Sequence, residues 1–125
     1  MIINAVCEYN DEGCIVYAEN FPGAFVRGRN YENAIAKFPK EIESYLDWAT
    51  GEAKIDSPIE IKLVQEKKNP DLKICDADSD VIFNSEREPL TKEEYNKLKI
   101  LALRSAMDLE RMYDSIPDKN MNIVL

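Results

Sequence analysis

The chain has 125 residues, of which 45% are hydrophobic and 32% are charged. This length and composition are typical of one globular domain that is large enough to bury a hydrophobic core. No apolar run approaches the roughly 18 residues that a membrane-spanning helix requires, and Met1 is not followed by a signal-like segment. We therefore expect a cytoplasmic protein with no membrane contact.

The net charge of −8 opposes binding to phosphate backbones, so direct contact with nucleic acid is not expected. An acidic surface suits a basic protein partner, although acidity more often serves solubility alone. The three cysteines are an odd number without close spacing, which argues against a disulfide framework. Cys7 and Cys14 lie at apolar strand positions, where we expect them to be buried.

The first half of the chain shows the alternating pattern of β-strands. Residues 2 to 9 and 14 to 19 alternate between apolar and polar side chains, with a turn at residues 10 to 13. If Tyr9 opposes Cys14 in this hairpin, Cys7 opposes Val16, and all four side chains share one apolar face. After a turn at Phe21, residues 24 to 29 are expected to form a short third strand.

A helix is predicted next, because the apolar period changes to 3.6 residues between positions 31 and 49. Asn30 is suited to cap its start and Gly51 to end it. Pro39 falls inside the pattern, where it removes a backbone hydrogen bond, so we expect a kink there. Residues 59 to 63 alternate again and predict a fourth strand, which makes the order β-β-β-α-β.

Three runs of residues in this half resemble the pattern of HicB-like antitoxin domains, which have a glycine-led strand, an LPG turn with a third strand, and a T-x-E-E-A helix start. The corresponding runs are residues 13 to 17, 21 to 28 and 30 to 34. The resemblance covers residues 1 to 64, with Asn30 in place of the threonine and Asn33 in place of a glutamate. It implies a reduced ribonuclease-H-like sheet without catalytic carboxylates.

Residues 65 to 90 are predicted to form a connector with a second hairpin, because Leu72 and Ile74 alternate with polar residues and 81 to 83 are apolar. Three acidic residues inside it, Asp76, Asp78 and Asp80, match the start of a calcium-binding loop. The glycine and the bidentate glutamate that complete such a loop are replaced by Val81 and Arg87. We therefore expect a solvated turn and no metal site.

A long helix is predicted from residue 91, within a final segment of residues 91 to 125. Thr91 and Glu94 form a capping box, and Pro117 is expected to end the helix. Its main apolar stripe, called the wide stripe below, consists of Tyr95, Leu98, Leu101, Ala102, Ala106, Leu109, Met112, Tyr113 and Ile116. This stripe is expected to pack on the sheet or on a neighbour.

Ile100, Leu103 and Met107 form a second apolar stripe, called the narrow stripe below, which we place roughly a third of a turn away. One packing surface cannot cover both stripes, so the helix is expected to meet a second surface. A second copy of the chain is the simplest source, because a two-fold axis lets one patch cover itself. The narrow stripe is thus the predicted interface of a homodimer.

Residues 102 to 118 also resemble the first helix of DinB-like four-helix bundles, with their "R…L…L…IPD" ending. Members of that family carry metal-binding histidines on later helices. The resemblance therefore implies an alternative, in which the chain is the N-terminal portion of a DinB-like metal-dependent enzyme whose catalytic helices are absent from the sequence.

The sequence contains no histidine, which removes the commonest general base and most zinc sites, and its four glycines form no phosphate-binding loop. We therefore predict no catalytic residue, no cofactor and no metal. The leading interpretation is a non-catalytic α+β protein-binding module that recognises a protein partner, or itself, through its sheet edge and its long second helix. No DNA-binding motif follows residue 56, so action at DNA is not expected.

Overall fold

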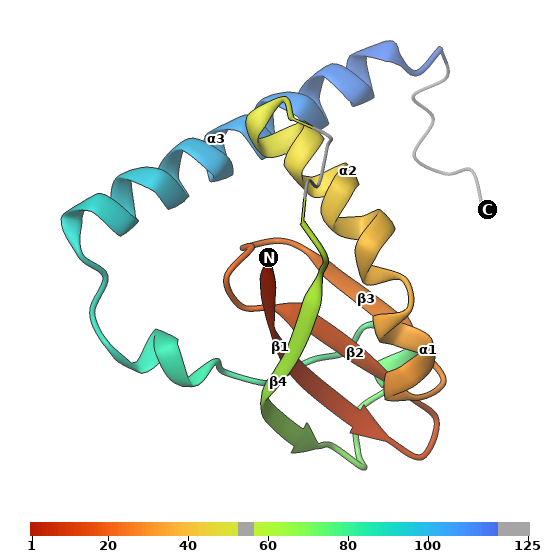
Figure 1. Ribbon diagram of the computed structural model, residues 1–125. Helices are drawn as coiled ribbons and strands as arrows, with labels where there is room; N and C mark the ends of the chain where they lie inside the picture. Colours follow the sequence, from red (N-terminus) through yellow and green to blue (C-terminus); the bar gives the residue numbers. More distant parts are fainter. Residues whose placement is uncertain (53–56, 118–125) are drawn as a thin grey trace. The chain divides into compact units, whose positions relative to one another are not determined.

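The computed structural model describes residues 1 to 52 and 57 to 117, and it is an α+β protein with a four-stranded mixed sheet and a long C-terminal helix (Figure 1). The strands are β1 (Ile2–Asn10), β2 (Gly13–Ala18), β3 (Phe25–Gly28) and β4 (Glu60–Lys68); the helices are α1 (Tyr31–Ile35), α2 (Phe38–Thr50) and α3 (Lys92–Ser115); two 3-10 turns are η1 (Ile74–Asp76) and η2 (Asn84–Arg87). The chain divides into two compact units, Met1–Glu88 and Pro89–Leu125. Among the described residues, no helix is long and apolar enough to cross a membrane.

The sheet of the first unit has the strand order β3-β2-β1-β4. Strands β1 to β3 form an antiparallel meander, in which Cys7 pairs with Val16 and Tyr9 with Cys14. This confirms the register that the sequence predicted. Strand β4 pairs with β1 in parallel and leaves one residue, Val64, outside the register between Leu63 and Gln65. Because of this bulge, Gln65 lies on the opposite side of the sheet from Leu63.

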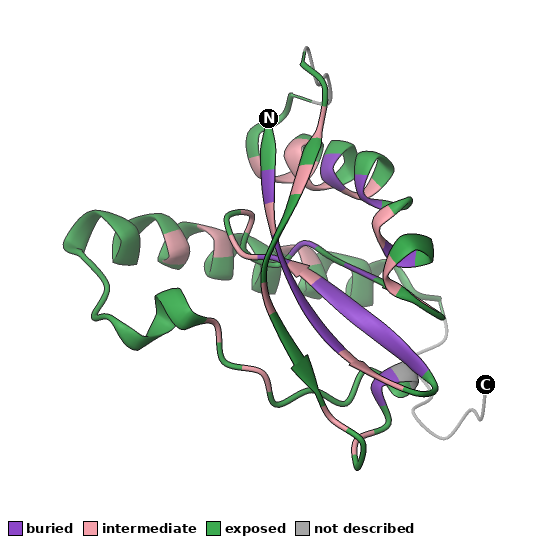
Figure 2. Cartoon of the chain, turned by 60° about the horizontal axis from the view of Figure 1, so that its bottom comes forward, coloured by how far each residue is buried: buried purple, intermediate pink, exposed green. Residues whose placement is uncertain are grey.

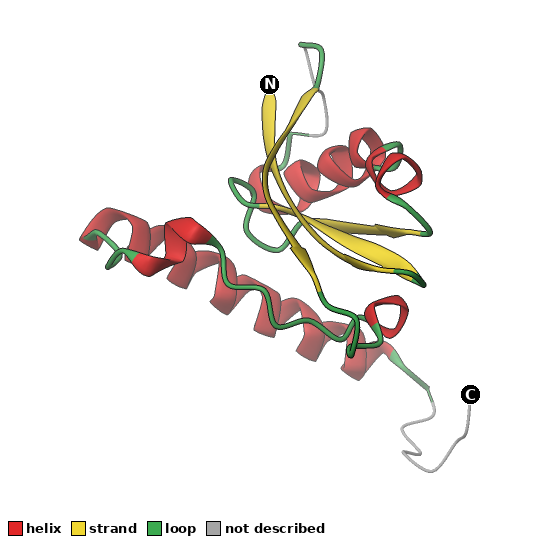
Figure 3. Ribbon diagram, turned by 90° about the horizontal axis from the view of Figure 1, so that it is seen from below, coloured by secondary structure: helices red, strands yellow, loops and turns green. Residues whose placement is uncertain are grey.

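Helices α1 and α2 cover one side of the sheet (Figure 3). Asn33 N–H donates to the Asn30 side chain at 2.9 Å, and Gly51 ends α2 in the left-handed conformation, as predicted. The expected kinked helix is instead two helices that separate at Ala36 and Lys37. Pro39 then lies in the first turn of α2. Backbone N–H groups in a first turn have no partner within the helix, so proline breaks no hydrogen bond there.

The main hydrophobic core lies between these helices and the sheet, and burial is concentrated on β1 and β2 (Figure 2). Phe38 and Ile42 of α2 are fully buried against it. The buried members of this core are Ile3, Ala5, Cys7, Cys14, Val16, Ala18, Ala24, Val26, Ala34, Phe38 and Ile42. Both cysteines are therefore in the core, as the strand pattern predicted.

The other side of the sheet is covered by residues 69 to 84, which we call the strap (Figure 3). The predicted second hairpin was wrong, because the described part of the strap contains the 3-10 turn η1 and no strand. Side chains satisfy its backbone instead: Asn10 Nδ2 donates to the carbonyls of Asn69 at 3.1 Å and Leu72 at 2.7 Å. Ile74, in the strap, is completely buried, so it anchors this segment to the sheet.

Candidate functional site

Helix α3 begins with the capping box that the sequence predicted. Glu94 N–H donates to Thr91 Oγ1 at 3.1 Å, and Thr91 N–H donates to Glu94 Oε1 at 3.2 Å. Hydrogen bonds from Thr91 lower the pKa of the Glu94 carboxyl below its ordinary value. The helix has 24 residues, which corresponds to a length of about 36 Å. Its start is thus determined locally, independently of the sheet.

No residue of α3 is buried within the part of the chain that the structure describes (Figure 2). In the narrow stripe, Ile100, Leu103 and Met107 are 62%, 56% and 52% exposed. In the wide stripe, Leu109 and Met112 are 62% and 57% exposed. Helix α3 therefore presents far more apolar surface than the isolated apolar side chains that are normal on proteins.

The two stripes of α3 lie on nearly opposite faces, which corrects the estimate of a third of a turn. The helix is continuous from Lys92 to Ser115, so position follows from 3.6 residues per turn. Ile100 and Leu109 are nine residues apart, or about two and a half turns, and they point in opposite directions. One flat surface cannot contact both stripes, so α3 offers two separate contact faces.

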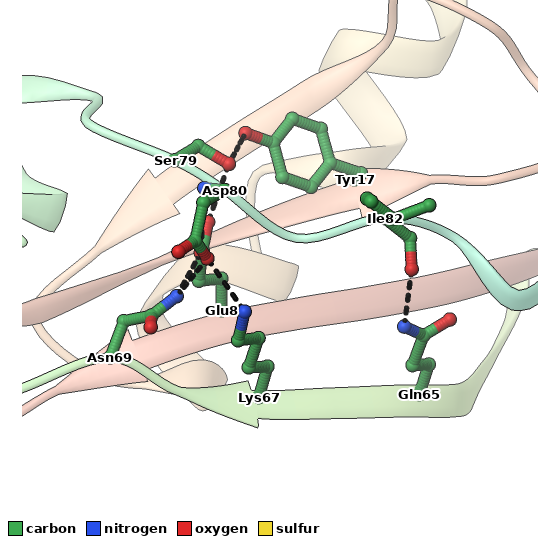
Figure 4. A network of polar contacts seen from close by, with 8 residues as sticks. All are labelled: Glu8, Tyr17, Gln65, Lys67, Asn69, Ser79, Asp80 and Ile82. Atoms are coloured by element: carbon green, nitrogen blue, oxygen red, sulfur yellow. Dashed lines mark hydrogen bonds and ion pairs between the residues drawn. The ribbon is translucent and has the colours of Figure 1, made fainter.

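A buried carboxylate, Glu8, holds the strap to the sheet (Figure 4). Its side chain on β1 is fully buried and accepts hydrogen bonds from Asn69 Nδ2, from Ser79 Oγ and, at 3.0 Å, from Asp80 N–H. Tyr17 on β2 extends the network, because its hydroxyl donates to Ser79 Oγ at 2.8 Å. Every oxygen of this carboxyl group has a partner from the strap, which is what a buried polar group requires.

Asp80 forms the exposed edge of this network. Lys67 Nζ lies 2.8 Å from Asp80 Oδ1, and Asn69 Nδ2 donates to the same oxygen at 2.7 Å. A hydrogen bond from Lys67 and, as the second cause, one from Asn69 lower the pKa of the Asp80 carboxyl below its ordinary value. Asp78 instead accepts from the Lys73 N–H at 3.3 Å. The two aspartates are thus engaged with different parts of the chain, and among the described residues no cluster of three potential metal ligands occurs.

A cavity of about 300 Å³ opens at the end of the sheet that carries the β1–β2 turn. Its lining residues include Cys7, Cys14, Tyr9, Tyr31 and Leu63. Burial, together with the neighbouring Cys14, raises the pKa of the Cys7 thiol to about 12, and burial also raises that of Cys14. Both thiols therefore stay protonated near neutral pH, a state with little nucleophilic character.

Sequence reasoning located the narrow stripe of α3, and the structure leaves its three side chains exposed, but it did not anticipate the network around Glu8. Glu8 alternates with the apolar residues of β1, a pattern that by itself indicates a side chain exposed to solvent. The available signal was the group of short polar side chains at positions 69 to 80, which can donate hydrogen bonds to a carboxylate. Only the chain path shows that they reach it.

No family model matches the chain, and searches of curated proteins and solved structures gave no significant match. The resemblance to HicB-like domains therefore stays a prediction from the three runs between residues 13 and 34.

Proposed function

We propose that this chain is a non-catalytic protein-binding module, resembling a HicB-type antitoxin domain, that acts through protein–protein association with α3 as its main contact element. The observation that carries the proposal is the exposure of two opposite apolar stripes on one well-capped helix. Contiguous exposed apolar surface of this kind typically marks an interaction site. Burying it would supply the hydrophobic driving force for association.

The charge distribution favours a second copy of the chain as the partner at α3. Helix α3 contains five lysines and arginines and five aspartates and glutamates, so its net charge is zero. The remainder has 11 basic and 19 acidic residues and therefore carries the whole charge of −8. Two copies repel each other least when their neutral helices meet. The acidic first unit remains available to a basic protein partner.

The first unit supports a binding role rather than a catalytic one. Its one fully buried carboxylate, among the described residues, is Glu8, which is occupied by three hydrogen bonds from the strap. Strand β4 is an edge strand, since β1 is the only strand that pairs with it in the part of the chain that the structure describes. An edge strand offers free backbone groups to another chain, so the sheet edge is a second candidate contact.

Sedimentation of two matched variants tests the association. We predict that the wild-type protein is a homodimer at tens of micromolar and that Leu103→Glu, which places a charge in the narrow stripe, makes it a monomer. Leu109→Glu introduces the same charge on the opposite face and serves as the matched variant. Loss of the dimer in Leu109→Glu alone would move the interface to the wide stripe, and a monomeric wild type would refute the proposal.

The alternative proposal is that α3 is the first helix of a DinB-like bundle within a metal-dependent enzyme. The two opposite apolar faces favour it, because a helix in a bundle contacts neighbours on more than one side. Sequencing of the gene beyond codon 125 tests this alternative. It requires further helices that carry histidines, and a stop codon at that point would eliminate it.

A further inference from the structure

After its first turn, which contains Lys92, Glu93 and Glu94, α3 carries its basic residues before its acidic ones. Lys97, Lys99 and Arg104 form a section from 97 to 104 with a charge of +3 and no acidic residue. The section from 108 to 114 contains three acidic residues and Arg111, so its charge is −2. We call these the basic section and the acidic section. Their charges, unlike the apolar stripes, distinguish one end of the helix from the other.

The two sections are far enough apart to act separately. Their centres are about ten residues from each other, which corresponds to roughly 16 Å along the helix axis. This exceeds the screening length of about 8 Å at physiological ionic strength, so each section responds mainly to the charges that face it. Both sections are accessible, since the side chains of Lys97 and Arg111 are each 74% exposed. Each also forms an exposed ion pair within the helix, Lys97 with Glu93 at 3.1 Å and Arg111 with Asp108 at 3.7 Å.

We infer that two copies of the chain pair through α3 in an antiparallel orientation, an inference that rests on the proposed self-association. A parallel pair would place basic section against basic section and acidic against acidic. An antiparallel pair places each basic section beside the partner's acidic section, which gives two attractive contacts. The order of the two sections along the helix is the same whichever apolar stripe forms the contact, so the orientation does not depend on the choice of stripe.

A full overlap of the two helices defines the register of this pair. Helix α3 extends from Lys92 to Ser115, so the two-fold axis passes between Leu103 and Arg104. At that register Lys97 lies at the same height as Glu110 of the second copy. Lys99 lies at the same height as Asp108 of the second copy. Each pairing occurs twice in the dimer because of the symmetry.

Charge reversal tests the orientation against the parallel alternative. The variant Lys97→Glu with Lys99→Glu changes the basic section to −1, so the antiparallel dimer brings two acidic sections together. We expect its dimer dissociation constant, measured by sedimentation, to rise roughly tenfold. Adding Asp108→Lys and Glu110→Lys to the same chain restores opposite signs, and this four-residue variant should return close to the wild-type affinity.

A control variant separates orientation from total charge. Lys40→Glu with Lys73→Glu makes the same change in net charge on exposed positions of α2 and the strap, and should leave the dimer constant nearly unchanged. Circular dichroism must show equal helix content in all variants.

In a parallel dimer the change at Lys97 and Lys99 removes repulsion, so that variant would associate as tightly as the wild type or more tightly. The two further changes at Asp108 and Glu110 would then not strengthen the dimer. That result would overturn the orientation and leave self-association standing. A wild type that stays monomeric would overturn both.

Discussion

Replacing Glu8 with alanine tests whether its buried side chain holds the strap to the sheet. The substitution removes the acceptor of hydrogen bonds from Asn69, Ser79 and the Asp80 N–H, all in a site without solvent exposure. A typical hydrogen bond contributes about 0.5 to 1.5 kcal/mol, and an unpaired buried donor costs about 1 to 3 kcal/mol. Asn69 still donates to Asp80 in the variant, so it is not left unpaired. We therefore expect the free energy of unfolding to fall by about 3 to 5 kcal/mol.

Urea denaturation followed by circular dichroism measures this loss as a change in the free energy of unfolding. The expected change is a large part of the roughly 5 to 15 kcal/mol that stabilises a typical domain. Glu43→Ala, at an exposed position of α2, is the matched control and should change stability by less than about 0.5 kcal/mol. Equal midpoints and slopes for Glu8→Ala and the wild type would refute the assigned role of the carboxylate.

Two further predictions concern the main core. Phe38→Ala should reduce the free energy of unfolding by about 3 to 5 kcal/mol, because Phe38 is fully buried between α2 and the sheet; an unchanged melting temperature would contradict this packing. Cys7 and Cys14 should resist a thiol-specific reagent at pH 7 in the folded protein and react after denaturation in urea. Burial raises both pKa values, so the reactive thiolate is scarce; rapid labelling of either thiol without denaturant would contradict their burial.

The local features of the fold were predictable from the sequence because they depend on neighbouring residues. Alternation determined the β1–β2 hairpin and its register, and side-chain capping determined the starts of α1 and α3 at Asn30 and Thr91. These signals act over two to five residues, where backbone geometry and side-chain reach limit the alternatives. Pro39 was misread for the same reason: its local signal fits a kink and a helix start equally, and the break at Ala36 decides between them.

The strap was not predictable, because its conformation depends on contacts across 61 to 72 positions of sequence. The short apolar runs near Leu72 and Ile82 resemble strands. However, side chains of β1 and β4 donate hydrogen bonds to backbone carbonyls of these runs, which a neighbouring strand would otherwise do. Gln65 Nε2 donates to the Ile82 carbonyl at 2.9 Å, for example. Such long-range pairs fix a segment only after the sheet has brought their donors and acceptors together.

For the candidate site, the sequence by itself determined which side chains of α3 are apolar and which are charged, together with their order along the helix. The tertiary structure decided what covers the sheet of the first unit, with α1 and α2 on one side and the strap on the other. Periodicity shows which residues form an apolar face, whereas contacts between segments far apart in the sequence, such as those of the strap with β1, form only when the chain has folded.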